Sequence, residues 1–95
     1  MAIQEVSQEK FVSLNLFDHC RALWPQEHER GWFVDTTEQL VGVLLEDAAT
    51  RLWGYSICRY RDDGHFHRIA VAADIPGAGM ARLELVASMR RELAA

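Results

Sequence analysis

RLWGYSICRYRDDGHFHRIAV, residues 51–71, is the stretch that decides the fold. Both of its halves are rich in aromatic and β-branched residues, and Asp62, Asp63 and Gly64 between them favour a turn. Two strand-forming segments joined by a short polar turn are typical of a β-hairpin. We therefore expect an antiparallel ribbon here, beside which the other strands of a meander can be placed.

The register of this hairpin follows from the charges beside the turn. A two-residue Asp-Gly turn would oppose Arg59 to Arg68, and a like-charge pair across two strands lowers stability. A three-residue loop with Gly64 in the left-handed conformation avoids that pair. In this register Ile57 faces Ile69, Tyr55 faces Val71 and Tyr60 faces Phe66.

Alternating apolar residues predict further strands before the hairpin. We expect one strand to begin at Trp32, after a solvated loop over 25–31, and a second strand over 40–45. The first hairpin strand covers 52–60, and its core-facing side carries Trp53, Tyr55 and Ile57. Trp32 and Trp53 are expected to be buried.

Helical signals occupy both ends of the chain. Ser7 is a favourable N-cap and predicts a helix from Gln8, and Asp18 caps a second short helix. After a loop over 72–79, apolar residues at helical spacing predict a helix over 78–93.

These elements predict an α+β fold, in which a three- or four-stranded antiparallel meander over 32–71 is covered by a C-terminal helix and by one or two N-terminal helices. Residues 1–95 are expected to form a single domain with one core. With 49% hydrophobic and 25% charged residues, the composition is that of a globular protein rather than a disordered chain.

The net charge of −4 is unevenly distributed. Residues 1–50 carry three basic and nine acidic side chains, whereas residues 51–95 carry seven basic and five acidic ones. An acidic chain lacks the cationic surface that binds a phosphate backbone. We therefore expect no nucleic-acid partner and favour a protein partner with a basic surface.

Cys20 and Cys58 are too few and too far apart for a disulfide framework, and the chain lacks the apolar segment of a secretory signal. No apolar run approaches the length of about 18 residues that spans a bilayer. We therefore expect a cytoplasmic protein with reduced thiols and no membrane association.

Basic side chains predict a candidate anion site on the hairpin. In the expected register one face collects Arg59, Arg61, His65 and His67. Guanidinium groups present planar forks of donors, and imidazole adds a charge that switches near neutral pH. The alternative interpretation is a solvated hairpin tip whose charges are offset by Asp62 and Asp63.

Motifs of catalysis and metal binding are missing from the sequence. GxSxG, Walker A and HExxH patterns do not occur, and neither cysteine has the CxxC or CxxH partner that marks a zinc site. We expect no catalytic residue, no metal and no cofactor, and a binding protein rather than an enzyme.

One enzyme-like signal is the loop 76–79, because backbone amides between a strand and a helix can hold a pyrophosphate. The segment IAVAADIPGAGMARLELV resembles the cofactor-binding strand, loop and helix of GCN5-type N-acetyltransferases, with their R/Q-x-x-G-x-G/A pattern. The resemblance implies an acyl-CoA-binding, N-acetyltransferase-like protein with Gly77 and Gly79 at the cofactor. It covers under a quarter of the chain, and Asp74 stands where that family has Arg or Gln.

A second resemblance extends from Trp32 to the C-terminus. The chain is similar to small bacterial proteins without an assigned activity, which share a Trp-aromatic strand, a Gly-Val-hydrophobic-acidic strand, a Trp-x-Tyr strand and an Arg-Asp-x-Gly-x-Phe hairpin. The matching segments are Trp32-Phe33, residues 42–47, Trp53-Gly54-Tyr55 and residues 61–66. This resemblance implies the fold and no site residue, and His67 departs from the Arg expected after the hairpin Phe.

The expected binding surface combines an exposed tryptophan with nearby carboxylates. It consists of Trp24, Glu27, Glu29, Glu46 and Asp47. An ordinary solvated surface is the alternative interpretation. Small acidic proteins without catalytic motifs include bacterial and phage-borne inhibitors of host defence, and this analogy favours a regulator or inhibitor. An unpaired edge of the meander would also allow a homodimer.

Overall fold

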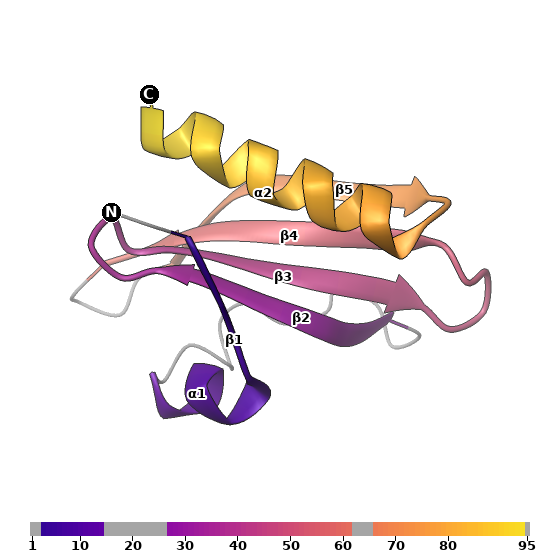
Figure 1. The fold of residues 1–95 in the computed structure, drawn as a ribbon, viewed down its shortest axis with the longest axis horizontal. Helices are drawn as coiled ribbons and strands as arrows, with labels where there is room; N and C mark the ends of the chain where they lie inside the picture. The colour runs from indigo at the N-terminus through magenta and orange to yellow at the C-terminus, as the bar shows by residue number, and fades with distance from the viewer. Residues whose placement is uncertain (1–2, 15–26, 62–65, 95) are drawn as a thin grey trace.

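The computed structural model describes residues 3–14, 27–61 and 66–94. Within these ranges five antiparallel strands form one sheet in sequence order (Figure 1). The elements are β1 (Gln4–Val6), α1 (Gln8–Ser13), β2 (Glu27–Asp35), β3 (Leu40–Asp47), β4 (Trp53–Tyr60), β5 (Phe66–Ile75) and α2 (Ala78–Ala94). The predicted α+β class is confirmed, but the sheet has five strands rather than three or four.

Helix α2 covers one face of the sheet and packs mainly against β3, β4 and β5 (Figure 1). Ala81, Leu85 and Met89 recur at helical spacing and are buried completely. The sheet residues of this cluster include Phe33, Leu40, Leu44, Tyr55, Ile57 and Ile75. Tyr55 and Ile57 therefore face the core as predicted, and Trp53 packs half-buried at the edge of the same cluster.

Helix α1 lies against the opposite face of the sheet (Figure 1). The Ser7 hydroxyl accepts a hydrogen bond from the Lys10 amide at 3.2 Å, so the predicted N-cap and the helix start at Gln8 are confirmed. Phe11 is completely buried, and its ring lies 6.5 Å from the ring of Trp32, which is only half-buried. The predicted short helix at Asp18 lies outside the described residues.

The hairpin register is confirmed beside the turn and wrong farther from it. Tyr60 opposes Phe66 as predicted, and Arg59 opposes His67. An irregularity between Ile57 and Cys58 then shifts β5 by one residue. Ile57 consequently opposes Ala70 and Tyr55 opposes Ala72, rather than Ile69 and Val71. One extra residue in a strand cannot be read from the spacing of apolar residues, because both registers preserve apolar pairs.

Three strands are longer than predicted, and a fourth is not predicted. β2 begins at Glu27 within the expected solvated loop, β3 continues to Asp47, and β5 continues to Ile75 through the first half of the expected loop 72–79. β1 pairs with β2, where Val6 opposes Trp32. The added strand residues form short or polar segments without a clear alternation of apolar side chains, so the sequence does not reveal them. Backbone pairing with a neighbouring strand stabilises them instead.

Gly54 sits where β4 and β5 approach too closely for any side chain. A Cβ atom at this position would lie 2.3 Å from the backbone oxygen of Ala72. We predict that Gly54→Ala lowers the free energy of unfolding by about 2–3 kcal/mol, because β4 and β5 must separate to admit the methyl group. Urea denaturation measures this loss as a lower unfolding midpoint, and the m-value is expected to stay the same as that of the native protein.

Gly79→Ala is the matched control, because a Cβ atom there meets nothing within 4 Å. Alanine also favours the helix, so this variant is expected to be as stable as the native protein or slightly more stable. Equal stability of the two variants would contradict the close approach at Gly54.

Candidate functional site

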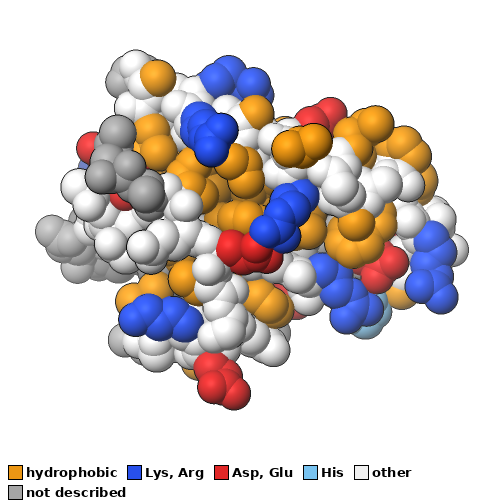
Figure 2. All heavy atoms as spheres, in the orientation of Figure 1, with side chains coloured by type: hydrophobic (Ala, Val, Ile, Leu, Met, Phe, Trp, Pro, Cys, Tyr) orange, Lys and Arg blue, Asp and Glu red, His pale blue; other side chains and the backbone are white. Residues whose placement is uncertain are grey.

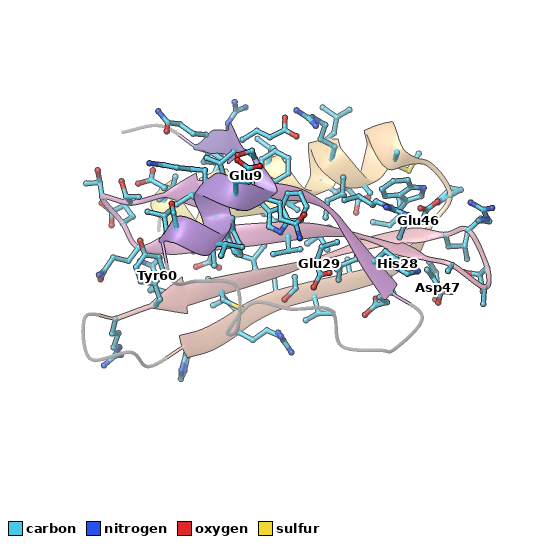
Figure 3. All side chains as sticks on the ribbon, turned by 90° about the horizontal axis from the view of Figure 1, so that it is seen from below. Glu9, His28, Glu29, Glu46, Asp47 and Tyr60 are labelled. Atoms are coloured by element: carbon cyan, nitrogen blue, oxygen red, sulfur yellow. The ribbon has the colours of Figure 1, made fainter. Side chains whose placement is uncertain are left out.

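Acidic side chains gather at the end of the sheet where β2 begins and β3 ends. Glu27 opposes Asp47, and His28 opposes Glu46. Figure 3 shows His28, Glu46 and Asp47 toward this end, Glu29 nearer the middle of the sheet and Tyr60 at the opposite end. We call the region of Glu27, Glu29, Glu46 and Asp47 the acidic end. Four of the five residues of the predicted binding surface, all except Trp24, therefore lie on two adjacent strands.

Two arginines hold the carboxylate of Glu46. Its carboxylate lies 3.2 Å from Nε of Arg30 and 3.8 Å from a terminal nitrogen of Arg51. Only 14% of its side chain is exposed. The charge of Glu46 is thus largely compensated within the protein, and little of it is presented to a partner.

Asp47 organises the turn between β3 and β4. Its Oδ1 atom accepts hydrogen bonds from the amides of Ala49 at 2.8 Å and Thr50 at 3.2 Å. The backbone amide of Asp47 donates to the carbonyl of Leu52 at 2.8 Å. The carboxylate is therefore fixed in place by the turn that it stabilises.

A pocket of about 230 Å³ opens at the acidic end. Three carboxylates from three strands line it, namely Glu27 of β2, Asp47 of β3 and Asp74 of β5. Leu52, Trp53, Gly54 and Ala73 complete the lining. The pocket thus combines a concentration of negative charge with an aromatic side chain at one place on the surface.

The pocket depends on a bulge in β5. Trp53 opposes Ile75 and Tyr55 opposes Ala72, so two residues of β5 face the single residue Gly54. Asp74 is one of these two residues and has a positive φ of 60°. Asp is among the few residues besides glycine that adopt this conformation readily. Asp74 thus enters the pocket lining from the bulge.

The arrangement of acidic groups does not match a metal site. Of the residues that the structure describes, no three His, Cys, Asp or Glu side chains are grouped so that they could hold a metal ion. The described helices also include none with the length and apolar character needed to cross a membrane.

The predicted cationic cluster lies at the opposite end of β4. Arg59 and His67 are register partners, and Arg61 and His67 are exposed. The Arg59 guanidinium donates to the carbonyl of Glu38 at 3.0 Å, so part of its donor capacity is used within the fold. His65 lies outside the described residues, and the anion site stays a prediction.

Gly77 and Gly79 lie at the start of α2. The Ala81 amide donates to the Gly77 carbonyl at 3.0 Å, so the helix begins directly after Gly77. A Cβ atom at either glycine would meet nothing within 4 Å, and the first turn holds no acidic residue. The fold itself therefore does not require these glycines for packing. A cofactor at this loop stays a prediction.

Comparisons with known proteins give no further guide to function. No protein-family model matches the chain, and neither the curated proteins nor the solved structures contain a significant match. Both resemblances drawn from the sequence therefore stay predictions that depend on the quoted motifs.

Sequence reasoning missed Asp74 as a member of the acidic site. The strand predicted from the sequence ends at Val71, which places Asp74 in a loop, far from Glu27 and Asp47. The one sequence signal that could have extended the predicted strand is the apolar, β-branched residue Ile75, which the structure buries. Trp24 falls outside the described residues.

The hydrogen bonds of Asp47 allow its charge and its structural role to be separated. We predict that Asp47→Ala lowers the free energy of unfolding by about 1 kcal/mol, because two turn amides lose their acceptor. Asp47→Asn keeps an acceptor oxygen and is expected to remain near native stability. Urea denaturation of both variants measures the difference, and equal destabilisation by Ala and Asn would show that the turn depends on the charge instead.

Proposed function

We propose that this protein is a small non-enzymatic binding module, a regulator or inhibitor, which takes a basic side chain of a protein partner into the pocket at its acidic end. The observation that carries the proposal is the convergence of Glu27, Asp47 and Asp74 on one pocket beside Trp53. A guanidinium or ammonium group is the partner chemistry that several carboxylates recognise best.

The size of the pocket supports a side chain rather than a cofactor. Its volume of about 230 Å³ is below the range of about 300–1,000 Å³ typical of small-molecule sites. A single arginine or lysine side chain fits this space, whereas a nucleotide cofactor does not. The aromatic surface of Trp53 adds a favourable contact for a guanidinium group.

The geometry also refines the surface expected from the sequence. Glu46 is compensated by Arg30 and Arg51, so the proposal gives its place to Asp74. Asp47 is held by the β3–β4 turn and is thus positioned before a partner arrives. A preorganised carboxylate loses little conformational freedom on binding, which favours affinity.

A triple variant tests the pocket directly. We predict that Glu27→Gln, Asp47→Asn and Asp74→Asn together weaken binding of a tri-arginine peptide about tenfold, because the guanidinium group loses its counter-charges. Asn tolerates a positive φ at position 74, and position 47 retains its acceptor, so the fold is expected to persist. Titration calorimetry at low and physiological salt measures the affinity.

The matched control is Glu9→Gln, Glu38→Gln and Glu84→Gln, which raises the net charge by the same three units at exposed positions outside the pocket. It is expected to change the peptide affinity only slightly, and less at higher salt. If the control weakens binding as much as the pocket variant, the peptide senses overall charge and the pocket proposal fails.

The acyl-CoA alternative makes a different prediction. A ligand that binds the folded state raises its melting temperature, so millimolar CoA or acetyl-CoA is expected to stabilise the protein if the loop at Gly77 and Gly79 holds pyrophosphate. Two features favour binding of an anionic cofactor at this loop, namely the open space at both glycines and the absence of an acidic residue in the first turn of α2. An unchanged melting temperature would exclude the acetyltransferase-like function.

A further inference from the structure

A second cavity, separate from the acidic end, lies between β1 and α2. Because α2 packs mainly against β3, β4 and β5, it leaves part of the neighbouring strands uncovered on this face (Figure 1). The resulting groove has a volume of about 540 Å³. Its apolar lining is Ile3, Phe33, Val86, Leu93 and Ala94. We call it the β1–α2 groove.

Two arginines of α2, Arg82 and Arg90, line this groove, and they differ in whether a carboxylate neutralises their charge. Arg82 forms a two-pronged ion pair with Glu5, with one contact of 2.8 Å, and its guanidinium lies 5.3 Å from the centre of the Phe33 ring. Figure 2 shows an acidic and a basic side chain in contact near the middle of this face, with hydrophobic side chains exposed around them. Arg82 is therefore neutralised, and it lines the groove together with Glu5.

Arg90 lies two helical turns beyond Arg82 on the same stripe of α2. It is exposed and has no hydrogen-bond or ion-pair partner among the residues that the structure describes. The groove thus offers an apolar floor, a neutral ion pair at one end and an uncompensated cation toward the other. This combination selects a ligand with an apolar body and one negative charge.

We propose that the β1–α2 groove binds a small amphipathic carboxylate, such as a medium-chain fatty acid. The carboxylate pairs with Arg90, and the aliphatic chain lies along Val86 and Phe33 toward the Glu5–Arg82 ion pair. Eight residues of helix separate the two arginines by about 12 Å. Because an extended alkyl chain is zigzag, it advances about 1.3 Å per carbon–carbon bond of about 1.5 Å, so a chain of about ten carbon atoms covers that length.

The dimensions favour a small molecule over a peptide. The volume lies within the range of about 300–1,000 Å³ typical of small-molecule sites. A peptide that added a strand to the sheet would need a longer edge, because β1 has only three residues and few backbone groups to pair. Arg90, which has no partner within the described part of the chain, also matches one carboxylate rather than a chain of charges.

Decanoate, decanol and decyltrimethylammonium form the test series, because they share the chain and differ in the charge of the head. Titration calorimetry at millimolar concentration is expected to give saturable one-to-one binding for decanoate, weaker binding for decanol and the weakest for the cation. Methyl resonances of Ile3, Val86 and Leu93 should shift in nuclear magnetic resonance spectra as decanoate binds.

Arg90→Gln is expected to weaken decanoate binding about tenfold and to leave decanol binding unchanged, because only the carboxylate loses a partner. Arg68→Gln is the matched control, since Arg68 is also exposed but lies on β5 outside the groove. Circular dichroism of both variants should match the native spectrum.

Three results would overturn the proposal. They are no saturable binding of decanoate at millimolar concentration, equal decanoate affinity of Arg90→Gln and the native protein, and tighter binding of a short hydrophobic peptide with a free carboxylate than of decanoate. The last would identify the groove as a peptide site. The triple variant of the pocket at the acidic end is expected to leave decanoate binding unchanged. The experiments therefore test the proposals for the pocket and for the β1–α2 groove independently.

Discussion

The fold depends on how closely α2 approaches the middle of the sheet. At Gly42 on β3 a side chain would meet Met89 Sδ at 2.8 Å and Leu85 at 3.1 Å, so the absence of a Cβ atom lets the helix settle onto the strands. A buried hydrogen bond of 3.1 Å between the hydroxyls of Tyr55 and Ser88 fixes the position of the helix along β4. With α2 placed over β3, β4 and β5, part of β1 and β2 stays uncovered, and the β1–α2 groove follows from that placement.

Because the strands run antiparallel without crossovers, residues distant in sequence meet at the two ends of the sheet. The acidic end collects the start of β2, the end of β3 and the end of β5, whereas the opposite end of β4 carries Arg59 and Arg61. Both ends carry charges of both signs, since Arg30 and Arg51 lie beside Glu46, and Glu38 lies beside Arg59. The carboxylates of the acidic end are therefore expected to act locally, at the pocket, because exposed charges farther apart are screened by salt.

The sequence predicted the elements that local signals specify and missed those that depend on distant partners. The N-cap at Ser7, the hairpin pair of Tyr60 with Phe66 and the C-terminal helix all follow from neighbouring residues. β1 and the first half of β2 have little apolar periodicity, and they are strands because another strand pairs with their backbones. The sequence therefore identifies the acidic residues of β2 and β3 one by one. It does not predict which of them oppose each other across the strands, or that Arg30 and Arg51 pair with Glu46.

Asp74 shows why the pocket itself could not be predicted. In a regular strand each residue opposes one partner, but here the bulge places Ala73 and Asp74 opposite the single residue Gly54. A positive φ at Asp74 costs stability through the backbone, and Asp is among the residues for which this cost is smallest. The bulge serves the core, because in a regular ladder Asp74 rather than Ile75 would oppose Trp53 on the face that α2 covers. A cation bound in the pocket would use a carboxylate whose position the burial of Ile75 already sets.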